Sequence, residues 1–285
     1  VYKRQVVASM VVRRVQRLAV ATQRVASGDL TAEVEASGHD ELATLSRDFN
    51  QMVAQLREGR TYRRLLGMTA SPQVADRLRE AFETGRLQFE AQLATATVLF
   101  ADIRGFTRFA ESRHPTEVIH FLNEYLDGLV GIIQQHDGVI NRFFGDAAMA
   151  FFGVLPEPQP PAQAAVSAIA AALDIVHYIE DFNRRLSARA QEPLRIGIGV
   201  STGTVVAGTV GSEERLDYTL LGDTVNVAYR LSYLNKDYPA WDLFISDDTY
   251  RLLPDGMCPT AVHLPGVEVK GRSKPLDVYA LELRR

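Results

Sequence analysis

Two aspartates stand where apolar segments end, and they are the residues of this chain best suited to carry chemistry. Asp102 follows the apolar run 97–101, and Asp146 lies in the turn between the apolar runs 139–144 and 147–152. Hard divalent cations such as Mg²⁺ prefer oxygen ligands. On adjacent strands the two carboxylates would lie close enough to share metal, and two bound metals clamp an in-line displacement at phosphorus. The pair therefore favours chemistry at a nucleotide phosphate.

Each aspartate alone also has an ordinary structural explanation. Asp102 could cap the helix that begins near Gly105, because aspartate is a preferred N-cap residue. Asp146 could serve only its two-residue turn with Gly145, because such turns favour both residue types. Almost entirely apolar strands flank that turn, so it lies against the core. Taken together, the two acids favour the metal site.

A third polar group lies in residues 222–230, Gly-Asp-Thr-Val-Asn-Val-Ala-Tyr-Arg. Asn226 and Arg230 are four residues apart, so on a helix they share one face. An amide and a guanidinium on one face suit a ribose and a charged phosphoryl group. The alternative is an ordinary surface helix that Asp223 caps.

The bulk composition is that of a folded protein of 285 residues, 46% of them hydrophobic, with a formal net charge of −4. This charge gives no general reason to expect a nucleic-acid partner. A single cysteine, Cys258, excludes an internal disulfide and fits a reducing compartment. No run of 18 or more apolar residues occurs, so no segment is expected to span a bilayer.

The first 30 residues are basic, with six Lys and Arg residues against one acid, Asp29. Such a start is typical of the cytoplasmic side of a transmembrane helix, and a solvated helix face is the alternative. Because the chain begins with Val1, it can be a piece of a longer protein. We expect it at the cytoplasmic face of the cell membrane, with the transmembrane segment upstream of this chain.

Two heptad seams mark the N-terminal segment as helical. The first consists of Val11, Val15, Leu18, Thr22 and Val25, and the second of Leu42, Leu45, Phe49, Met52 and Leu56. Gly28 ends the first seam. Two short seams cannot bury themselves alone, so they predict a dimeric four-helix bundle. A helical hairpin packed on the next domain is the alternative.

Three short motifs in this segment, at 28–30 (Gly-Asp-Leu), 40–43 (Asp-Glu-Leu-Ala) and 49–52 (Phe-Asn-Gln-Met), resemble those of a HAMP domain. The HAMP domain is the signal relay of bacterial membrane receptors. The resemblance implies a HAMP domain with a juxtamembrane start over residues 1–57. Residues 58–92 are then expected to be a linker helix that transmits the signal, with a flexible linker as the alternative.

From residue 93 onward, strand and helix patterns alternate. Strands are expected at 94–101, 139–144, 147–152, 194–202, 205–210, 218–221, 243–246 and within 267–282, and helices at 72–82, 115–136, 162–186 and 223–235. Hairpins join several of the strands. The predicted class is α+β with a mostly antiparallel sheet.

Three longer motifs, at 100–107, 144–146 and 217–226, resemble the catalytic domain of class III adenylyl and guanylyl cyclases. The resemblance covers residues 93–285. It implies a ferredoxin-like core that dimerises head to tail and places its active sites at the interface. It also implies two divalent metal ions, Mg²⁺ or Mn²⁺, as cofactors.

The resemblance assigns roles to individual positions. Asp102, the carbonyl of Ile103 and Asp146 match metal ligands; Asn226 and Arg230 match the pair that orients ribose and stabilises the pentavalent phosphorus; Phe106, Thr107, Arg142, Arg195, Thr219 and Lys270 match substrate-binding positions. In the family one protomer supplies the metal ligands and the other supplies the Asn/Arg pair. A monomer is therefore expected to be inactive.

The two positions that read the base depart from the family pattern. Arg142 stands where adenylyl cyclases have lysine and guanylyl cyclases glutamate, and Thr219 stands where they have aspartate and cysteine. Adenine N1 accepts a hydrogen bond, whereas guanine N1–H donates one and is complemented by an acceptor such as a carboxylate. Arginine offers donors only, so ATP is favoured. GTP stays an alternative, because arginine can donate to guanine O6.

The sequence therefore predicts an adenylate cyclase that converts ATP to 3′,5′-cyclic AMP and pyrophosphate as a homodimer under HAMP control. One alternative is a guanylate cyclase, and another is a catalytically silent signalling module of the same fold. A diguanylate cyclase is less favoured, since its Gly-Gly-Asp/Glu-Glu-Phe turn is absent from 144–147, which reads Phe-Gly-Asp-Ala. No nucleic-acid partner is expected.

Overall fold

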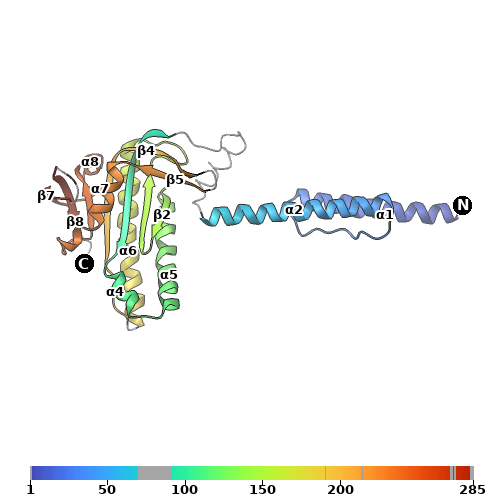
Figure 1. Cartoon of the computed structure of the whole chain (residues 1–285), viewed down its shortest axis with the longest axis horizontal. Helices are drawn as coiled ribbons and strands as arrows, with labels where there is room; N and C mark the ends of the chain where they lie inside the picture. Colours follow the sequence, from blue (N-terminus) through green and yellow to red (C-terminus); the bar gives the residue numbers. More distant parts are fainter. Residues whose placement is uncertain are drawn as a thin grey trace. The chain divides into compact units, whose positions relative to one another are not determined.

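The computed structural model describes residues 2–69, 91–189, 191–212, 215–269, 272 and 274–282. The chain divides into two compact units, Val1–Ala70 and Ser71–Arg285 (Figure 1). The predicted helix at 72–82 lies outside the described residues.

The N-terminal unit is a pair of helices, α1 (Tyr2–Ala26) and α2 (Glu41–Thr69). Gly28 adopts φ +93° just after α1, which a glycine tolerates without steric cost, so the predicted stop is confirmed. The connector between the helices runs along α2: the side chain of Asn50 donates to the Val34 carbonyl (2.8 Å) and accepts from the Val34 N–H (2.9 Å).

The two predicted seams are only partly buried within one chain. Phe49 is 7% exposed and packs with Val53 and Val34, with Leu18 and Val25 partly buried against them. The remaining apolar seam residues, apart from the half-buried Leu42, are exposed: Val11, Val15, Leu45, Met52 and Leu56. The hairpin therefore forms a small core and leaves an apolar stripe uncovered.

The C-terminal unit is built on one sheet in the order β2-β3-β1-β4-β6-β8-β7, with β5 paired to β4. The strands are β1 (Gln92–Ile103), β2 (Val139–Phe144), β3 (Ala147–Phe152), β4 (Ile196–Ser212), β5 (Arg215–Leu221), β6 (Leu243–Ser246), β7 (Val262–Val267) and β8 (Leu276–Leu281). Only the β4–β6 pairing is parallel among the described strands. The predicted α+β class with a mostly antiparallel sheet is confirmed.

Helices cover both faces of this sheet. They are α4 (Phe106–Glu111), α5 (Pro115–Gln135), α6 (Pro161–Ala188), α7 (Asp223–Ser232) and α8 (Asp247–Tyr250), with a 3₁₀ turn at Leu234–Lys236. Leu99 and Ala101 belong to the core that α5 and α6 close. Phe100 lies between them and points to the opposite face, where its ring centroid is 5.3 Å from that of Tyr229 on α7. Figure 1 shows α5 and α6 side by side along the sheet.

One described helix, α6, is long and apolar enough to cross a membrane by length and composition alone. Its buried residues, among them Ile169, Ile175 and Phe182, belong to the core that covers β1 and β4. We therefore interpret α6 as the central core helix of this unit.

Two of the expected boundaries that proved wrong bear on the site. The segments at 194–202 and 205–210 form one strand, β4, because Gly203 continues the ladder opposite Ala96 instead of breaking it. A Cβ atom at Gly203 would lie 2.6 Å from Oγ1 of Thr224, so this glycine provides close contact with α7. The helix expected at 223–235 ends at Ser232 and continues only as the 3₁₀ turn.

Candidate active site

Asp102 is the second-last residue of β1 and pairs with Gly197 of β4. It is 7% exposed. It does not cap a helix, because α4 has Gly105 at its N-cap position with φ +72°. The alternative interpretation of Asp102 as an N-cap residue is therefore wrong. Its position places a carboxylate at the end of a central strand, next to the backbone of Ile103.

Asp146 reaches the same place from the β2–β3 hairpin. Gly145 takes φ +66° in the turn, and the pairing of Ala101 with Ala148 sets that turn beside the end of β1. The charge of Asp146 acts on the carboxyl of Asp102, and the backbone of Ile103 lies near the carboxyl of Asp146. The structure thus brings together the two acids and the third predicted metal-ligand position.

Burial and mutual repulsion disfavour two negative charges at this place. Burial, followed by the charge of Asp146, raises the pKa of Asp102 to about 6, and the charge of Arg104 opposes this rise. Burial likewise raises the pKa of Asp146. A divalent cation would relieve the repulsion, because an opposite charge favours the ionised form of each carboxyl.

The donor set fits Mg²⁺ or Mn²⁺ shared with a phosphate ligand. Among the described residues, no group of three or more His, Cys, Asp or Glu side chains could form a metal cage. Mg²⁺ is usually held by one or two carboxylates, with substrate phosphates and waters as its other ligands. The two aspartates and a backbone carbonyl match that pattern.

Arg104 is a residue of this site that the sequence reading missed. Its Nη1 atom lies 3.3 Å from Oδ2 of Asp102, and its Cζ atom lies 4.9 Å from the centre of the Tyr233 ring. Burial lowers the pKa of this guanidinium. The motif Asp-Ile-Arg placed it two residues from Asp102, but its direction depends on the packing of α7 against β4.

The two predicted base-reading residues, Arg142 and Thr219, are linked within one chain. Asn141 is the extra residue of a β-bulge in β2, and a bulge can re-aim a side chain. Asn141 accepts a hydrogen bond from Oγ1 of Thr219 (3.1 Å) and donates to the carbonyl of Tyr218 (2.7 Å). Asp217 forms an ion pair with Arg142. Asn141 and Asp217 were also missed by the sequence reading.

Asn226 and Arg230 lie on α7. Asn226 is exposed and Arg230 is half-buried, so their shared helix face is at least partly open. Among the described residues, neither side chain forms an ion pair or hydrogen bond with Asp102 or Asp146. Gly222, rather than Asp223, occupies the N-cap position of this helix. The described hydrogen bonds and ion pairs of one chain therefore do not join the two parts of the predicted site.

The other predicted substrate-binding residues are dispersed around the aspartates. Arg195 immediately precedes β4; its Nη2 atom donates to the Pro239 carbonyl (2.7 Å) and lies 3.3 Å from Oδ1 of Asp242. Phe106 is half-buried and Thr107 is exposed at the start of α4. Lys270 lies outside the described residues.

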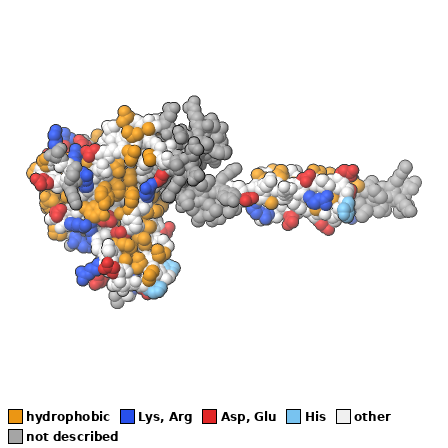
Figure 2. All heavy atoms as spheres, in the orientation of Figure 1, with side chains coloured by type: hydrophobic (Ala, Val, Ile, Leu, Met, Phe, Trp, Pro, Cys, Tyr) orange, Lys and Arg blue, Asp and Glu red, His pale blue; other side chains and the backbone are white. Residues whose placement is uncertain are grey.

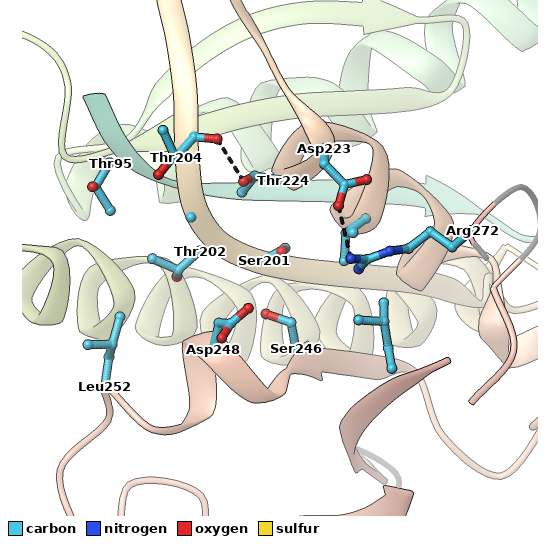
Figure 3. A pocket seen from close by; sticks show the side chains of 13 residues that line it. Thr95, Ser201, Thr202, Thr204, Asp223, Thr224, Ser246, Asp248, Leu252 and Arg272 are labelled. Carbon is cyan, nitrogen blue, oxygen red and sulfur yellow. Dashed lines mark hydrogen bonds and ion pairs between the residues drawn. The ribbon is translucent and has the colours of Figure 1, made fainter. Parts of the chain in front are cut away.

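A separate cavity of about 530 Å³ lies between the first turn of α7 and the start of α8 (Figure 3). Hydroxyl groups of Ser201, Thr202 and Thr224 line it, and Asp223 lies 3.1 Å from Arg272 at its edge. Its lining includes neither aspartate of the pair and neither Asn226 nor Arg230. This cavity is therefore distinct from the candidate metal site.

The model of the adenylate and guanylate cyclase catalytic domain matches residues 90–282. The chain belongs to the class III cyclase family. A HAMP domain model matches residues 6–58 of this cyclase. Both resemblances predicted from the motifs are confirmed.

Mycobacterial proteins are among the curated relatives of this cyclase. Uncharacterized protein Rv1320c of Mycobacterium tuberculosis is 35% identical over 256 residues, which cover 90% of this chain and 42% of that protein. Uncharacterized protein Rv1319c of the same organism is 37% identical over 229 residues, 80% of this chain and 40% of that protein. The chain thus spans about two fifths of the length of these relatives.

The solved structures similar to this cyclase include enzymes named for each nucleotide. The adenylyl cyclase CyaB from P. aeruginosa is 31% identical, with a TM-score of 0.60 over 67% of this chain and 95% of that one. The guanylyl cyclase Cya2 is 30% identical, with a TM-score of 0.59 over 67% and 93%. A bacterial light-regulated adenylyl cyclase reaches a TM-score of 0.68 at 26% identity, over 82% and 63%. These similarities support membership of the cyclase family, and they do not distinguish ATP from GTP as the substrate.

Proposed function

We propose that this cyclase converts ATP to 3′,5′-cyclic AMP and pyrophosphate at sites shared between two copies of the chain. One observation carries the proposal: Asp102 and Asp146 lie close enough for their charges to interact, whereas among the described residues no hydrogen bond or ion pair joins Asn226 or Arg230 on α7 to either of them. A second copy placed head to tail would bring its α7 to the aspartates of the first. Each protomer would supply half of each site.

The reaction is an internal transfer at the α-phosphorus. The ribose 3′-oxygen forms a bond to the α-phosphorus, the bond from that phosphorus to the bridging oxygen of pyrophosphate breaks, and the hydroxyl proton leaves to water. When bound, divalent cations at the aspartates would acidify the 3′-hydroxyl and neutralise the triphosphate.

The chain's own residues position the nucleotide around that displacement. Asp102, Asp146 and the carbonyl of Ile103 would hold the divalent cations, which would in turn bind the phosphates. Asn226 of the other protomer orients the ribose, and its Arg230 donates to the developing charge on phosphorus. Arg195 and Lys270 are assigned to the triphosphate.

A second copy also accounts for exposed apolar surface. Large apolar side chains are 43–53% exposed on β2, β4, β5 and α7: Phe143, Phe144, Val210, Leu221 and Tyr229. Figure 2 shows hydrophobic side chains gathered on the visible face of this unit. Such patches mark interaction surfaces in soluble proteins, and these lie on the same strands and helix as the residues assigned to the shared site.

The hydrogen-bonding pattern of the base-reading residues favours ATP. Arg142 offers donors only, and the hydroxyl proton of Thr219 is used on Asn141, which leaves lone pairs that can accept. Adenine presents an acceptor at N1 and a donor at its 6-amino group, which complement these two residues. GTP is the second candidate, because Arg142 can donate to guanine O6 and Cya2 is a guanylyl cyclase.

Product analysis tests this proposal directly. The purified protein is supplied with ATP or GTP and with Mg²⁺ or Mn²⁺, and cyclic nucleotides are separated by chromatography. We expect cyclic AMP from ATP, and no product from the Asp102→Ala variant with its fold retained. Cyclic GTP as the main product would support the guanylate cyclase, and no product from a purified dimer would support a silent signalling module.

Regulation through the HAMP domain is part of the proposal. The uncovered stripe on α1 and α2, which includes Val15, Leu45 and Leu56, suits a four-helix bundle with the second copy. Leu56→Glu would bury a charge in that bundle and should change cyclase activity while leaving the catalytic unit folded. Unchanged oligomeric state and activity in this variant would argue against a HAMP role. The membrane location predicted for the upstream segment also belongs to this proposal.

A further inference from the structure

The strongest unassigned feature of the catalytic unit is the side chain of Arg104. This side chain is only 13% exposed, and its ion-pair partner, the side chain of Asp102, is 10% exposed. The 3.3 Å approach joins Nη1 of Arg104 to the carboxylate that the proposed function places on metal. Arg104 therefore touches a predicted metal ligand without being one itself.

Two further contacts fix the direction of this guanidinium. It lies over the ring of Tyr233, the residue that follows α7. It also lies against Gly197, the residue of β4 that pairs with Asp102 of β1, where a Cβ atom would collide with Nη2 of Arg104. Ring stacking and the absence of a side chain at 197 together create a slot for a planar cation.

Stability does not explain this arrangement. The Nε and Nη2 atoms of Arg104 are buried and have no hydrogen-bond partner among the described residues. Unpaired buried donors and a buried charge each cost free energy. A buried ion pair is often no more stable than an apolar replacement of the same volume. A polar group kept at such a place is better explained by a role at the site.

We propose that Arg104 is a positioning residue that fixes the carboxylate of Asp102 for cation binding and ties it to the C-terminal end of α7 through Tyr233. This inference rests on the proposed function, which assigns Asp102 to the metal. Residues that hydrogen-bond metal ligands orient them, and their loss costs about 10- to 100-fold in metal affinity or activity. The planar fork of Arg104, and not its charge alone, provides that orientation.

Charge and orientation predict opposite effects, so substitutions can separate them. Removing a positive charge next to Asp102 would by itself strengthen cation binding, whereas losing the fixed orientation would weaken it. Arg104→Lys keeps the charge and removes the planar fork. We expect this variant to bind Mn²⁺ about 10-fold more weakly.

The measurement is a titration of the full chain with Mn²⁺ in the absence of nucleotide. Binding is monitored through the electron paramagnetic resonance signal of the free ion. Arg108→Lys is the matched control, because Arg108 is exposed on the neighbouring α4, and its affinity should not change. Circular dichroism and thermal melts establish that each variant is folded. Equal Mn²⁺ affinity in the Arg104→Lys and unaltered proteins would overturn the proposal.

A second pair of variants tests the same idea without touching Arg104. Tyr233→Phe keeps the ring face and should bind Mn²⁺ normally, whereas Tyr233→Leu removes it and should repeat the loss seen with Arg104→Lys. This pair decides the matter if Arg104→Lys fails to fold. Normal affinity in Tyr233→Leu would count against the proposal. Because Mn²⁺ binding needs no turnover, a failure of this inference is distinct from a failure to produce cyclic nucleotide.

Discussion

Thr219 donates a hydrogen bond of 3.1 Å to Asn141, and this bond joins two strands, β2 and β5, that are not paired in the sheet. The bulge at Asn141 directs its amide to β5, where it also binds the Tyr218 carbonyl at 2.7 Å. Arg142, the next residue on β2, reaches Asp217 on β5. The positions assigned to the base therefore form one connected group within a protomer.

This connection predicts a role for Asp217 in nucleotide binding. Asp217→Asn removes the charge that holds Arg142, so the guanidinium should become less ordered. Both side chains are over a third exposed, and such pairs contribute about 0.2–1 kcal/mol. We expect KM for ATP to rise about two- to five-fold with little change in kcat, measured by steady-state kinetics. Asp181→Asn, in an exposed ion pair on α6, is the control, and an unchanged KM in Asp217→Asn would contradict the prediction.

Sharing of the site between protomers predicts complementation. Asp102→Ala and Asn226→Ala should each be inactive as homodimers, because each lacks one half of both sites. In an equal mixture, half of the dimers would be mixed and would contain one intact site, so activity should recover to about a quarter of the unaltered level. The assay is cyclic nucleotide production after subunit exchange. No recovery in a mixture proven to contain mixed dimers would contradict a shared site.

The raised pKa of Asp102 predicts that ionisation of this carboxyl lowers the free energy of unfolding of the metal-free protein. Between pH 4 and about pH 6 the folded carboxyl holds a proton that the unfolded one has lost, so the free energy of unfolding falls as pH rises through this window. Asp102→Asn removes that fall. At pH 8 without metal, we expect this variant to be more stable by about 1–3 kcal/mol.

Thermal or denaturant unfolding at two pH values checks this expectation. At pH 4 the carboxyl is protonated in the folded protein, so the two proteins should differ little. A variant less stable than the unaltered protein at pH 8 would show that the ion pair with Arg104 outweighs burial and the charge of Asp146. Added Mg²⁺ should stabilise only the unaltered protein, since stabilisation by a ligand requires binding to the folded state.

Gly197 provides a steric test of the same region. A Cβ atom there would collide with the backbone carbonyl of Ser232 as well as with Arg104, and a backbone atom cannot move aside cheaply. Gly197→Ala should therefore destabilise the protein by about 1–3 kcal/mol and weaken Mn²⁺ binding. Gly131→Ala is the matched control: nothing lies within 4 Å of its added Cβ, and alanine favours the helix by about 1 kcal/mol. Equal stability of the two variants would contradict the close packing at Gly197.

Much of the fold was predictable because its signals are local. The apolar runs at 139–144 and 147–152 around a Gly-Asp turn predicted the β2–β3 hairpin with the bounds it has. The break predicted at Gly203 was wrong. A glycine within a strand pattern is consistent both with a turn and with the close approach of another segment, and the sequence does not distinguish them. That distinction depends on α7, which follows about twenty residues later.

The sequence by itself determined which side chains could do the chemistry: two aspartates at strand ends, an Asn/Arg pair at helical spacing, and the motifs that place them in the cyclase family. Only the tertiary structure decided what surrounds them. Arg104 contacts Asp102 because α7 packs against β4 and offers the ring of Tyr233, and Asn141 binds Thr219 because a bulge turns it to another strand. The Asn141–Thr219 and Arg104–Tyr233 contacts join residues 78 and 129 positions apart, and periodicity along the chain carries no information about them.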